Sequence, residues 1–446
     1  MSVKTVCVIG AGPSGITAAK NLMDRGFDVT VLDRGAEVGG NWVFDADSGH
    51  SSVFETTHII SSRGYSQYAD YPMPDTYPDY PSHQQLAAYF RGYAEHFGVD
   101  RRVRFRTTVE DCTQCEGGQW RVVSRGPDGE RADDFDALVV ANGHHWSPRW
   151  PDIPGEFTGH LLHSHDFKRA APFVGKRVLV IGGGNSACDV AVETARVAEH
   201  AAISWRRGYW IVPKFVFGMP SDVLHNRLSG WLRWLPSAMR FRGAEWVLRF
   251  VQGRNRLYGL PEPDHRFGET HPTVNSELFY ALRHGHLATK PDVARFAGGK
   301  TVEFVDGTVE EFDAIVACTG FRIAHPFLSG AVLDFSEGQV PLYLKMLPAS
   351  HERLYFIGLF QPLGCIWPAA ELQSKIMARH LTGEWSPAGA LPELIRDELA
   401  TPDVKQLDSP RHTITVDFPA FRRRLLAQLP KEYVSRTPMS GERRAG

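Results

Sequence analysis

The segment Thr5-Val6-Cys7-Val8-Ile9-Gly10-Ala11-Gly12-Pro13-Ser14-Gly15 opens with an apolar run and closes with three spaced glycines. Residues 16–25 then carry apolar side chains at helical spacing, and residues 28–32 form a second apolar run that ends at Asp33. A strand, a glycine turn, a helix and a second strand that ends in an acid are typical of the βαβ unit that binds a dinucleotide. The segment therefore predicts an α/β fold with a parallel sheet.

Each glycine of this turn has a separate physical task. Gly10 permits the tight turn, Gly12 lets a pyrophosphate approach the backbone, and Gly15 lets the helix pack on the strand. The N-terminus of the helix that follows the turn offers unpaired N–H groups and a positive dipole end to the phosphates.

Asp33 lies 23 residues after Gly10 (33 − 10). A carboxylate in this position can accept a hydrogen bond from a ribose 2′-hydroxyl, and it would repel a 2′-phosphate. The first site should therefore hold FAD or NAD rather than NADP.

A second signal of the same kind starts at residue 176. The apolar run 176–181 leads into Gly182-Gly183-Gly184-Asn185-Ser186-Ala187, and a further apolar run follows at 201–205. This last run ends in Arg206 and Arg207 instead of an acid, with Arg206 lying 24 residues after Gly182 (206 − 182). A guanidinium fork can bind a 2′-phosphate in a bidentate manner, so the pattern favours NADPH over NADH. The simpler interpretation is a solvated pair of charges after a strand.

A chain of 446 residues is too long for a single core. We expect an α/β protein with two Rossmann-like, three-layered dinucleotide-binding domains, the second inserted into the first. The predicted ranges are residues 1–155 and 323–446 for the two parts of the FAD-binding domain, and 156–322 for the NADPH-binding domain with a helical insertion at about 210–285. Ala141-Asn142-Gly143 and Cys318-Thr319-Gly320 end comparable strands, one in each domain.

Composition excludes several classes of protein. The formal net charge of −2 gives no reason to expect nucleic acid or an anionic membrane as a partner. The N-terminus runs directly into a strand, and no run of about 18 apolar residues exists, so we expect a cytoplasmic protein without a spanning helix.

Six cysteines do not form a disulfide framework. Cys112 and Cys115 form a lone CxxC pair, which we interpret as two side chains on a hairpin rather than a redox or metal site.

Three further segments have a predicted role. Gly39 and Gly40 let the backbone pass close to a flat or charged group, and Trp42 after them is expected to form a cofactor wall. Residues 56–81 form a long loop, and Ser82 should cap a helix over residues 83–97. The insertion at residues 210–260 is rich in Trp and Phe, which we expect mainly in the core, although this apolar insertion could also be a dimer surface.

The run Phe157-x-Gly159-x-x-x-His163-x-x-x-Phe167 resembles the fingerprint of the flavin-containing monooxygenases. The related Baeyer–Villiger monooxygenases usually carry Trp where this chain has Phe167. The resemblance covers residues 3–385 and extends to four other runs, which are His265-Arg266-Phe267, His271-Pro272-Thr273-Val274-Asn275, Gln361-Pro362-Leu363-Gly364 and Glu371-Leu372-Gln373. We interpret His163 as a structural residue that shapes the NADPH site.

The resemblance implies an NADPH-dependent enzyme in which reduced FAD forms a flavin hydroperoxide with dioxygen. This species then oxygenates an amine nitrogen or a sulfide sulfur of a small molecule, in a site from which the protein excludes water. The expected FAD-binding residues are Gly10, Gly12, Pro13, Ser14, Gly15, Asp33, Arg34, Gly40, Asn41, Trp42, Val109, Ala141, Gly143 and Gln361. The expected NADPH-binding residues are Gly182, Gly184, Asn185, Ser186, Arg206, Arg207, Asn275, Cys318, Thr319 and Gly320.

The sequence departs from the family at one position. The family has an asparagine before a Ser-Ser pair near the flavin, and a gapless alignment on Ser61 and Ser62 places Ile60 there. An isoleucine cannot donate a hydrogen bond to a peroxide. His58, Ser61 and Asn275 are the candidates for a replacement donor. Two alternatives are that bound NADP⁺ does more of the stabilising, or that the alignment contains a gap and a residue next to Ile60 fills the role.

Three other functions remain open at this point. A Baeyer–Villiger enzyme would oxygenate a ketone. An NADPH oxidase or disulfide reductase would share both nucleotide sites, although a reductase needs a redox CxxC beside the flavin. A non-enzymatic flavoprotein that serves as a binding or sensing module would not need two nucleotide sites. The sequence does not specify the substrate.

Overall fold

The computed structural model describes residues 3–44, 49–231, 234–270, 272–329, 332, 340–362, 364–401, 414–431 and 433. His271, Leu363 and the C-terminal residues 441–446 lie outside this set. The chain divides into two compact units. The first comprises Met1–Ser51, Thr57–His144 and Ile323–Gly446, and the second comprises Ser52–Thr56 and His145–Arg322. Each unit is described separately.

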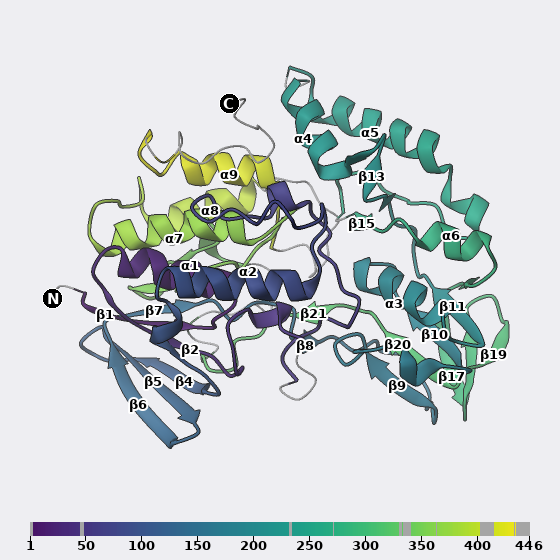
Figure 1. Ribbon diagram of the computed structural model, residues 1–446, viewed down its shortest axis with the longest axis horizontal. Helices are drawn as coiled ribbons and strands as arrows, with labels where there is room; N and C mark the ends of the chain where they lie inside the picture. The colour runs from purple at the N-terminus through teal and green to yellow at the C-terminus, as the bar shows by residue number, and fades with distance from the viewer. Residues whose placement is uncertain are drawn as a thin grey trace. The chain divides into compact units, whose positions relative to one another are not determined.

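The first unit is built on a parallel sheet of five strands (Figure 1). The strand order is β24-β7-β1-β2-β3, with bounds Leu354–Phe356, Ala137–Val140, Thr5–Ile9, Asp28–Leu32 and Val103–Arg104. In the register of β1, Thr5 is opposite Asp28 and Val6 is opposite Ala137. Strands β1 and β7 are almost entirely buried, as is typical of a parallel sheet covered on both faces.

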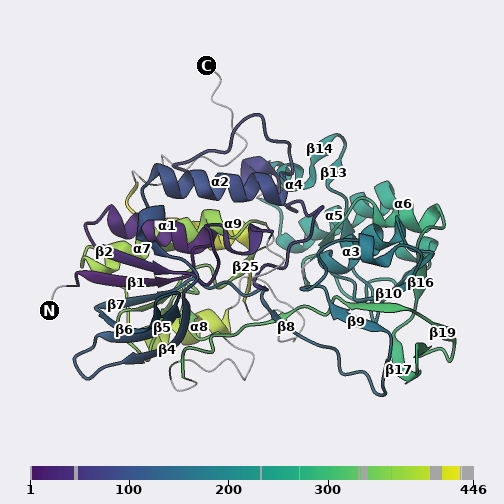
Figure 2. The same cartoon turned by 60° about the horizontal axis from the view of Figure 1, so that its bottom comes forward.

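Helices cover this sheet. Helix α1 (Pro13–Met23) packs on β1 and β2 and also contacts α2 (His83–His96) and α7 (Trp367–Leu381) (Figure 2). Helix α2 begins at Ser82, whose hydroxyl accepts from the Gln85 N–H while the Gln85 side chain accepts from the Ser82 N–H. This capping box explains the predicted start of the helix.

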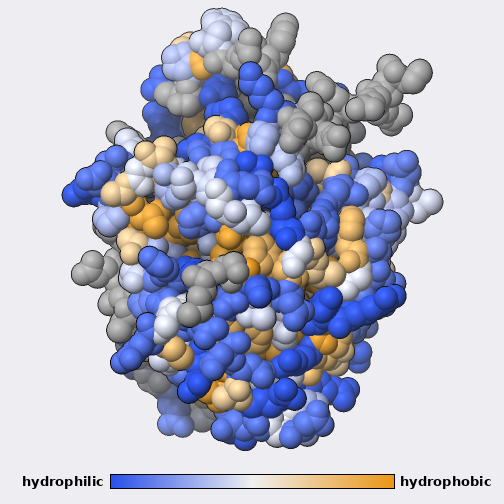
Figure 3. All heavy atoms as spheres, turned by 90° about the vertical axis from the view of Figure 1, so that its left-hand side faces the viewer, coloured by the Kyte–Doolittle hydropathy of each residue, from blue (hydrophilic) through white to orange (hydrophobic). Residues whose placement is uncertain are grey.

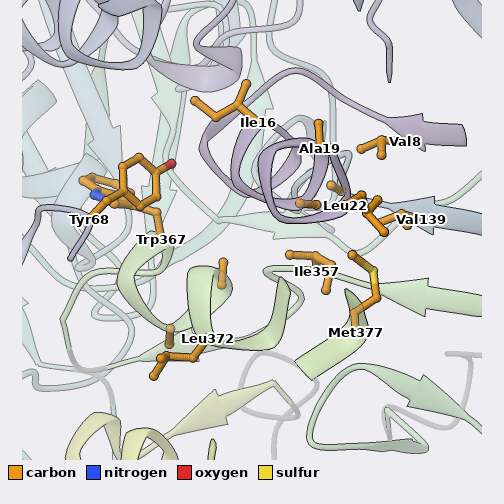
Figure 4. Close-up of a cluster of buried hydrophobic side chains, with 14 of the residues drawn as sticks. Val8, Ile16, Ala19, Leu22, Tyr68, Val139, Ile357, Trp367, Leu372 and Met377 are labelled. Atoms are coloured by element: carbon orange, nitrogen blue, oxygen red, sulfur yellow. The ribbon is translucent and has the colours of Figure 1, made fainter. Parts of the chain in front are cut away.

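The core of the first unit lies between the sheet, α1 and α7. Figure 4 shows side chains from all three elements pointing toward one another, among them Val8, Val139, Leu22, Ile357 and Met377. On the face shown in Figure 3, hydrophilic residues predominate and hydrophobic ones form smaller patches between them.

Shorter elements complete the first unit. An antiparallel sheet contains β4 (Thr108–Gln114), β5 (Trp120–Gly126) and β6 (Gly129–Phe135). Cys112 is buried on β4 and Cys115 follows it on the β4–β5 hairpin, as predicted. The remaining elements are η1 (Gly40–Trp42), η2 (Arg63–Tyr65), η3 (Asp100–Arg102), β22 (Leu342–Tyr343), β23 (Leu347–Pro348), β25 (Gln361–Pro362), α8 (Leu391–Ala400), β26 (Thr415–Val416) and α9 (Phe418–Leu426).

The second unit repeats this design. Its five parallel strands have the order β16-β11-β10-β20-β9, with bounds Ala288–Lys290, His200–Ser204, Arg177–Ile181, Ala314–Ala317 and His160–His163. Helix α3 (Asn185–Ala195) packs on β10 and β11. An antiparallel sheet follows, formed by β17 (Val293–Gly298), β18 (Thr301–Phe304) and β19 (Val309–Glu311). The two parallel sheets confirm the predicted α/β class.

The fifth strand distinguishes the two sheets. In the first unit the strand beside β7 is β24, which comes late in the chain, whereas in the second unit the strand beside β20 is β9, which comes early. Close to where the chain passes between the units, β8 (Ser147–Pro148) pairs antiparallel with β21 (Phe321–Arg322). Both ends of the main segment of the second unit therefore lie side by side.

The fingerprint run forms part of the second sheet. His160–His163 is the edge strand β9, which pairs with β20. A Cβ on Gly159 would lie 2.5 Å from the Phe157 ring and 2.8 Å from the Asp313 carbonyl oxygen, so any other residue would force the backbone to shift. Phe167 is buried and stacks on Phe173 at 5.5 Å. The run is thus a packing element of one unit.

The insertion is only partly helical. The predicted range 210–285 contains β12 (Ile211–Val212), β13 (Phe215–Val216), β14 (Met219–Pro220), α4 (Ser221–Trp231), α5 (Ser237–Gln252), η5 (Asn255–Tyr258), β15 (Thr273–Val274) and α6 (Leu278–Arg283). The short element η4 (Ala171–Phe173) precedes it. The prediction that its aromatic residues are mainly core was wrong for Trp234, Trp246 and Phe250, which are 75%, 77% and 82% exposed. Helix α5 packs through the face that carries Leu248 and Glu245 and leaves the opposite face uncovered.

Candidate coenzyme sites

In the first unit, the predicted flavin residues meet at the carboxyl ends of the parallel strands. Gly10 ends β1 with φ of +106°, and a Cβ there would lie 2.6 Å from the carbonyl oxygen of Ala141, which follows β7. The strand order reverses between β1 and β7. Dinucleotides bind α/β sheets at such a switch point.

The N-terminus of α1 is open to an anion. Gly12 precedes the helix without a side-chain cap among the described residues, and Pro13 occupies the first turn. A Cβ on Gly15 would lie 1.8 Å from the Gly10 carbonyl oxygen, which explains the close helix–strand contact. The first N–H groups of α1 are therefore available to an anion such as a pyrophosphate.

Other segments approach this turn. A Cβ on Gly40 would lie 2.9 Å from the Gly12 Cα, so residues 39–42 cross the turn closely. The Tyr68 hydroxyl donates to the Pro13 carbonyl at 2.6 Å. Gly358 (φ +80°) follows β24, and a Cβ there would lie 2.1 Å from the Ser14 Oγ. Gly358 and Tyr68 were not predicted from the sequence, although a third strand that ends in glycine was a usable signal.

Asp33 is buried at the end of β2 and holds the turn itself. Its Oδ2 accepts from the Ala11 N–H at 2.5 Å, and its Oδ1 accepts from the Gly35 N–H at 2.6 Å. Burial raises the pKa of Asp33, while these two backbone hydrogen bonds oppose the rise. Each carboxylate oxygen has a second lone pair for a ribose hydroxyl.

The remaining predicted flavin residues surround the same edge. Trp42 packs edge-on against Trp367 at 5.8 Å. The Gln361 Oε1 lies 3.2 Å from the His144 Nε2. Arg34 donates a hydrogen bond to His50, and the Asn41 carbonyl accepts one from Ser51. Gly143 has φ of +70° just after β7. Val109 packs with the last residues of β1, β2 and β7, which are Ile9, Leu32 and Val140.

The second unit places its predicted residues at the corresponding edge. Gly182 has φ of +131°, and a Cβ there would lie 2.5 Å from the Cys318 carbonyl oxygen. Helix α3 begins after Gly184, again without a side-chain cap among the described residues. Ser186 is exposed in the first turn of the helix. Thr319 and Gly320 follow Cys318 at the end of β20.

The two arginines after β11 differ in their surroundings. Arg206 is exposed, whereas the Arg207 guanidinium lies over the Tyr209 ring at 5.6 Å. The Tyr209 ring covers Gly183, because a Cβ on that glycine would lie 2.2 Å from a ring carbon. Tyr209 was not predicted as a site residue.

The candidate donors for the missing asparagine are not equivalent. Ser61 is buried, and its hydroxyl lies 2.8 Å from the Ser66 hydroxyl. His58 is exposed, and Ile60 is half-buried. The Asn275 side chain is occupied, because its Nδ2 donates to Asp189 at 2.7 Å and its Oδ1 accepts from the N–H groups of residues 277 and 278. Asn275 therefore belongs to the second unit's packing.

Two buried histidines are neutral at physiological pH. Burial, together with the neighbouring His165, lowers the pKa of His163 to about 4. Burial also lowers the pKa of His325 to about 4. The His163 Nδ1 accepts from the His165 N–H at 3.1 Å, as suits a structural residue.

We expect these two histidines to make the folded protein less stable at acidic pH. Both pKa values are lower in the folded state than the usual value near 6.5, so the unfolded chain binds more protons below that pH. Each histidine should cost about 2–3 kcal/mol of unfolding free energy as the pH falls from about 6.5 to about 4. Thermal unfolding measured across this range should show a smaller decline for His163→Gln than for the wild type. The exposed His286→Gln control should decline as the wild type does, and an equal decline in all three would contradict the assignment.

Comparisons with known proteins agree with this geometry. Residues 3–399 match the family model described as flavin-binding monooxygenase-like. Mouse flavin-containing monooxygenase 5 is 35% identical over 441 residues, which cover 94% of this chain and 81% of the mouse protein. The rabbit protein named dimethylaniline monooxygenase [N-oxide-forming] 2 is 35% identical over 398 residues, covering 85% and 74%. The chain belongs to the flavin-containing monooxygenase family.

Solved structures have the same fold as this flavin-containing monooxygenase. S-allyl-L-cysteine S-oxygenase from Allium sativum has a TM-score of 0.70 and 24% identity, covering 96% of this chain and 89% of that one. A cyclohexanone monooxygenase structure has a TM-score of 0.71 at 17% identity, covering 96% and 97%. The Baeyer–Villiger structure is thus the more distant in sequence.

Membership confirms several predictions at once. This flavin-containing monooxygenase is an oxidoreductase that uses FAD and NADPH, with dioxygen and a small molecule as its substrates. Among the described residues, no helix combines the length and the apolar composition needed to cross a bilayer.

Proposed function

We propose that this enzyme oxygenates a soft nucleophile, an amine nitrogen or a sulfide sulfur, with FAD held by the first unit and NADPH by the second. The supporting observation is the pair of glycine turns, each leading into a helix N-terminus without a side-chain cap among the described residues. One turn is followed by buried Asp33 and the other by Arg206 and Arg207. The names of the rabbit and garlic relatives support nitrogen and sulfur as the oxygenated atoms.

The cofactors supply hydride transfer and the activation of dioxygen, and the residues of the chain bind and orient them. The N–H groups at the start of α1 and α3 are suited to the two pyrophosphates. Asp33 suits an unphosphorylated ribose, and the two guanidinium groups suit a 2′-phosphate. Ser61 and Trp42 are candidates for the surroundings of the flavin ring, which must be shielded from water.

The test uses the purified FAD-loaded enzyme with NADPH and three substrate types: a tertiary amine, a thioether and a cyclic ketone. NADPH consumption is compared with the amount of oxygenated product measured by mass spectrometry. An N-oxide or sulfoxide in near-stoichiometric yield is the expected result. A lactone as the main product would favour Baeyer–Villiger chemistry, and NADPH consumption that yields only hydrogen peroxide would favour an oxidase.

We also propose a homodimer formed through helix α5. One face of this helix carries four exposed apolar side chains, which we call the α5 ridge. They are Met239 (56% exposed), Trp246 (77%), Val247 (36%) and Phe250 (82%). Aromatic side chains bury about 150–250 Å² each. The ridge, together with Trp234 just before α5 in the chain, therefore offers more apolar surface than singly scattered exposed residues do. Arg242 is exposed beside the ridge, and its guanidinium group can stack on an aromatic ring of a second copy.

The α5 ridge gives a measurable prediction. Trp246→Ser with Phe250→Ser should shift the protein from dimer to monomer in sedimentation velocity while the flavin remains bound. Because both side chains are exposed, the substitutions should leave the unfolding temperature within a few degrees of the wild type. Val305→Ser, at another exposed apolar residue of the second unit, is the control. A wild-type monomer, or a ridge variant that stays dimeric, would exclude this interface.

A further inference from the structure

A short segment of the second unit is bound to the glycine turn by three side-chain hydrogen bonds. The Thr273 hydroxyl donates to the Gly183 carbonyl at 2.8 Å. The Val274 N–H donates to the Asn185 Oδ1 at 2.7 Å, and the Asn275 Nδ2 donates to the Asp189 Oδ1 at 2.7 Å. These contacts join residues about 90 positions apart in the sequence. Thr273–Asn275 therefore acts as a brace along the start of α3.

The brace holds the part of α3 that would face a pyrophosphate. Asn185 is the first residue of the helix, and Asp189 lies one turn further along the same face. The Val274 N–H holds the Asn185 Oδ1, and this bond fixes the orientation of the Asn185 side chain. The backbone N–H groups of the turn remain as donors, and their direction depends on how the turn is held.

The bond between Asp189 and Asn275 has a fixed polarity. A carboxylate only accepts, so the Asn275 amide must direct its Nδ2 toward Asp189 and its Oδ1 toward the N–H groups of Glu277 and Leu278 at the start of α6. The amide thus connects α3 to α6 in a single orientation. Lys214 is the positive charge that acts on Asp189, whereas Glu193 and Glu277 repel it. A further negative charge at position 275 would break this balance.

We infer that Asp189 and Asn275 are positioning residues for NADPH, which set the direction of the N–H groups at the start of α3 without touching the coenzyme. This inference rests on the proposed NADPH site in the second unit. The sequence pattern of the glycine turn does not predict this positioning role, because the brace comes from a distant segment of the chain.

The structure supplies an exchange experiment. Asn275→Asp places two carboxylates face to face, although an aspartate at 275 can still cap α6. Asp189→Asn keeps an acceptor for Asn275. The double variant reverses the pair, with the amide at 189 donating to the carboxylate at 275. Calorimetric titration of the FAD-loaded protein with NADP⁺ gives the dissociation constant, and thermal unfolding without NADP⁺ reports stability.

Asn275→Asp should weaken NADP⁺ binding by at least about tenfold, as expected when a hydrogen bond to a charged group is lost. Asp189→Asn and the double variant should bind within about threefold of the wild type. Asn21→Asp is the matched control, because Asn21 is a buried amide that donates to the Thr17 carbonyl on α1. It should lower the unfolding temperature and leave NADP⁺ affinity unchanged.

Several outcomes overturn the inference. One is wild-type affinity in Asn275→Asp, and another is a double variant as weak as the single one. If Asn275→Asp does not fold, Thr273→Val removes only the donor to Gly183 and should weaken NADP⁺ binding, and unchanged affinity there rejects the brace. A wild type that binds no NADP⁺ would instead reject the proposed NADPH site itself.

Discussion

Gly10→Ala should purify without flavin, and Gly182→Ala should keep its flavin but lose NADPH binding. Both glycines have positive φ, and in both an added Cβ would press on the carbonyl oxygen at the end of the adjacent strand, at 2.6 and 2.5 Å. A contact under 3 Å with backbone forces the turn to shift, and positive φ adds strain of about 1–3 kcal/mol for a residue with a side chain. The turn that moves is the one that would approach the pyrophosphate.

The two readouts separate the two sites. Flavin content is measured by absorbance after gel filtration, and NADP⁺ affinity by calorimetry. Gly10→Ala should lose at least about nine-tenths of its flavin, and Gly182→Ala should bind NADP⁺ at least about 100-fold more weakly. Gly117→Ala is the matched control, since this glycine has no positive φ and its Cβ would meet open space. Flavin loss in Gly182→Ala with retention in Gly10→Ala would reverse our assignment of the sites.

Reversing the charge of Arg206 and Arg207 should remove the preference for NADPH over NADH. A 2′-phosphate in a charge-assisted contact with two guanidinium groups contributes about 1.5–3 kcal/mol per bond, and two glutamates would repel it. We expect kcat/KM for NADPH to fall about 100-fold or more while the value for NADH changes little. Stopped-flow reduction of the bound flavin by each coenzyme measures this directly.

The control for the arginine pair is Arg101→Glu with Arg102→Glu, an exposed arginine pair of the first unit. It should leave discrimination between the coenzymes unchanged. Single reversals are also informative, because Arg206 is exposed and Arg207 lies over Tyr209. If the double reversal at 206 and 207 kept its NADPH preference, the two guanidinium groups would not be the phosphate ligands.

The fold could be predicted where a short stretch of sequence determines the local structure. Thr5–Ile9 and Asp28–Leu32 are strands with the predicted bounds, because short apolar runs next to a glycine turn leave few alternatives. Ser82 begins α2 as predicted, since its capping box is complete within four residues. The fingerprint was harder, because His160–His163 becomes a strand only by pairing with β20, about 150 residues further along the chain.

The aromatic insertion shows where composition misleads. Trp246 and Phe250 are exposed because α5 turns its other face inward, and hydrophobicity alone cannot give that orientation. Asp189, Tyr209 and Gly358 were missed for another reason. Each acts through a contact with a distant segment, which no short motif records.

The pairing of β8 with β21 has a consequence for how this architecture can be rebuilt. Ser147 is opposite Arg322 in an antiparallel ribbon, so the two backbones are about 5 Å apart where the main segment of the second unit begins and ends. Residues 145–322 could therefore be exchanged between relatives through two neighbouring splice points, together with the short segment Ser52–Thr56 that belongs to the same unit. Under the proposed assignment of FAD to the first unit and NADPH to the second, such chimaeras should take the coenzyme preference of the donor and the flavin site of the recipient.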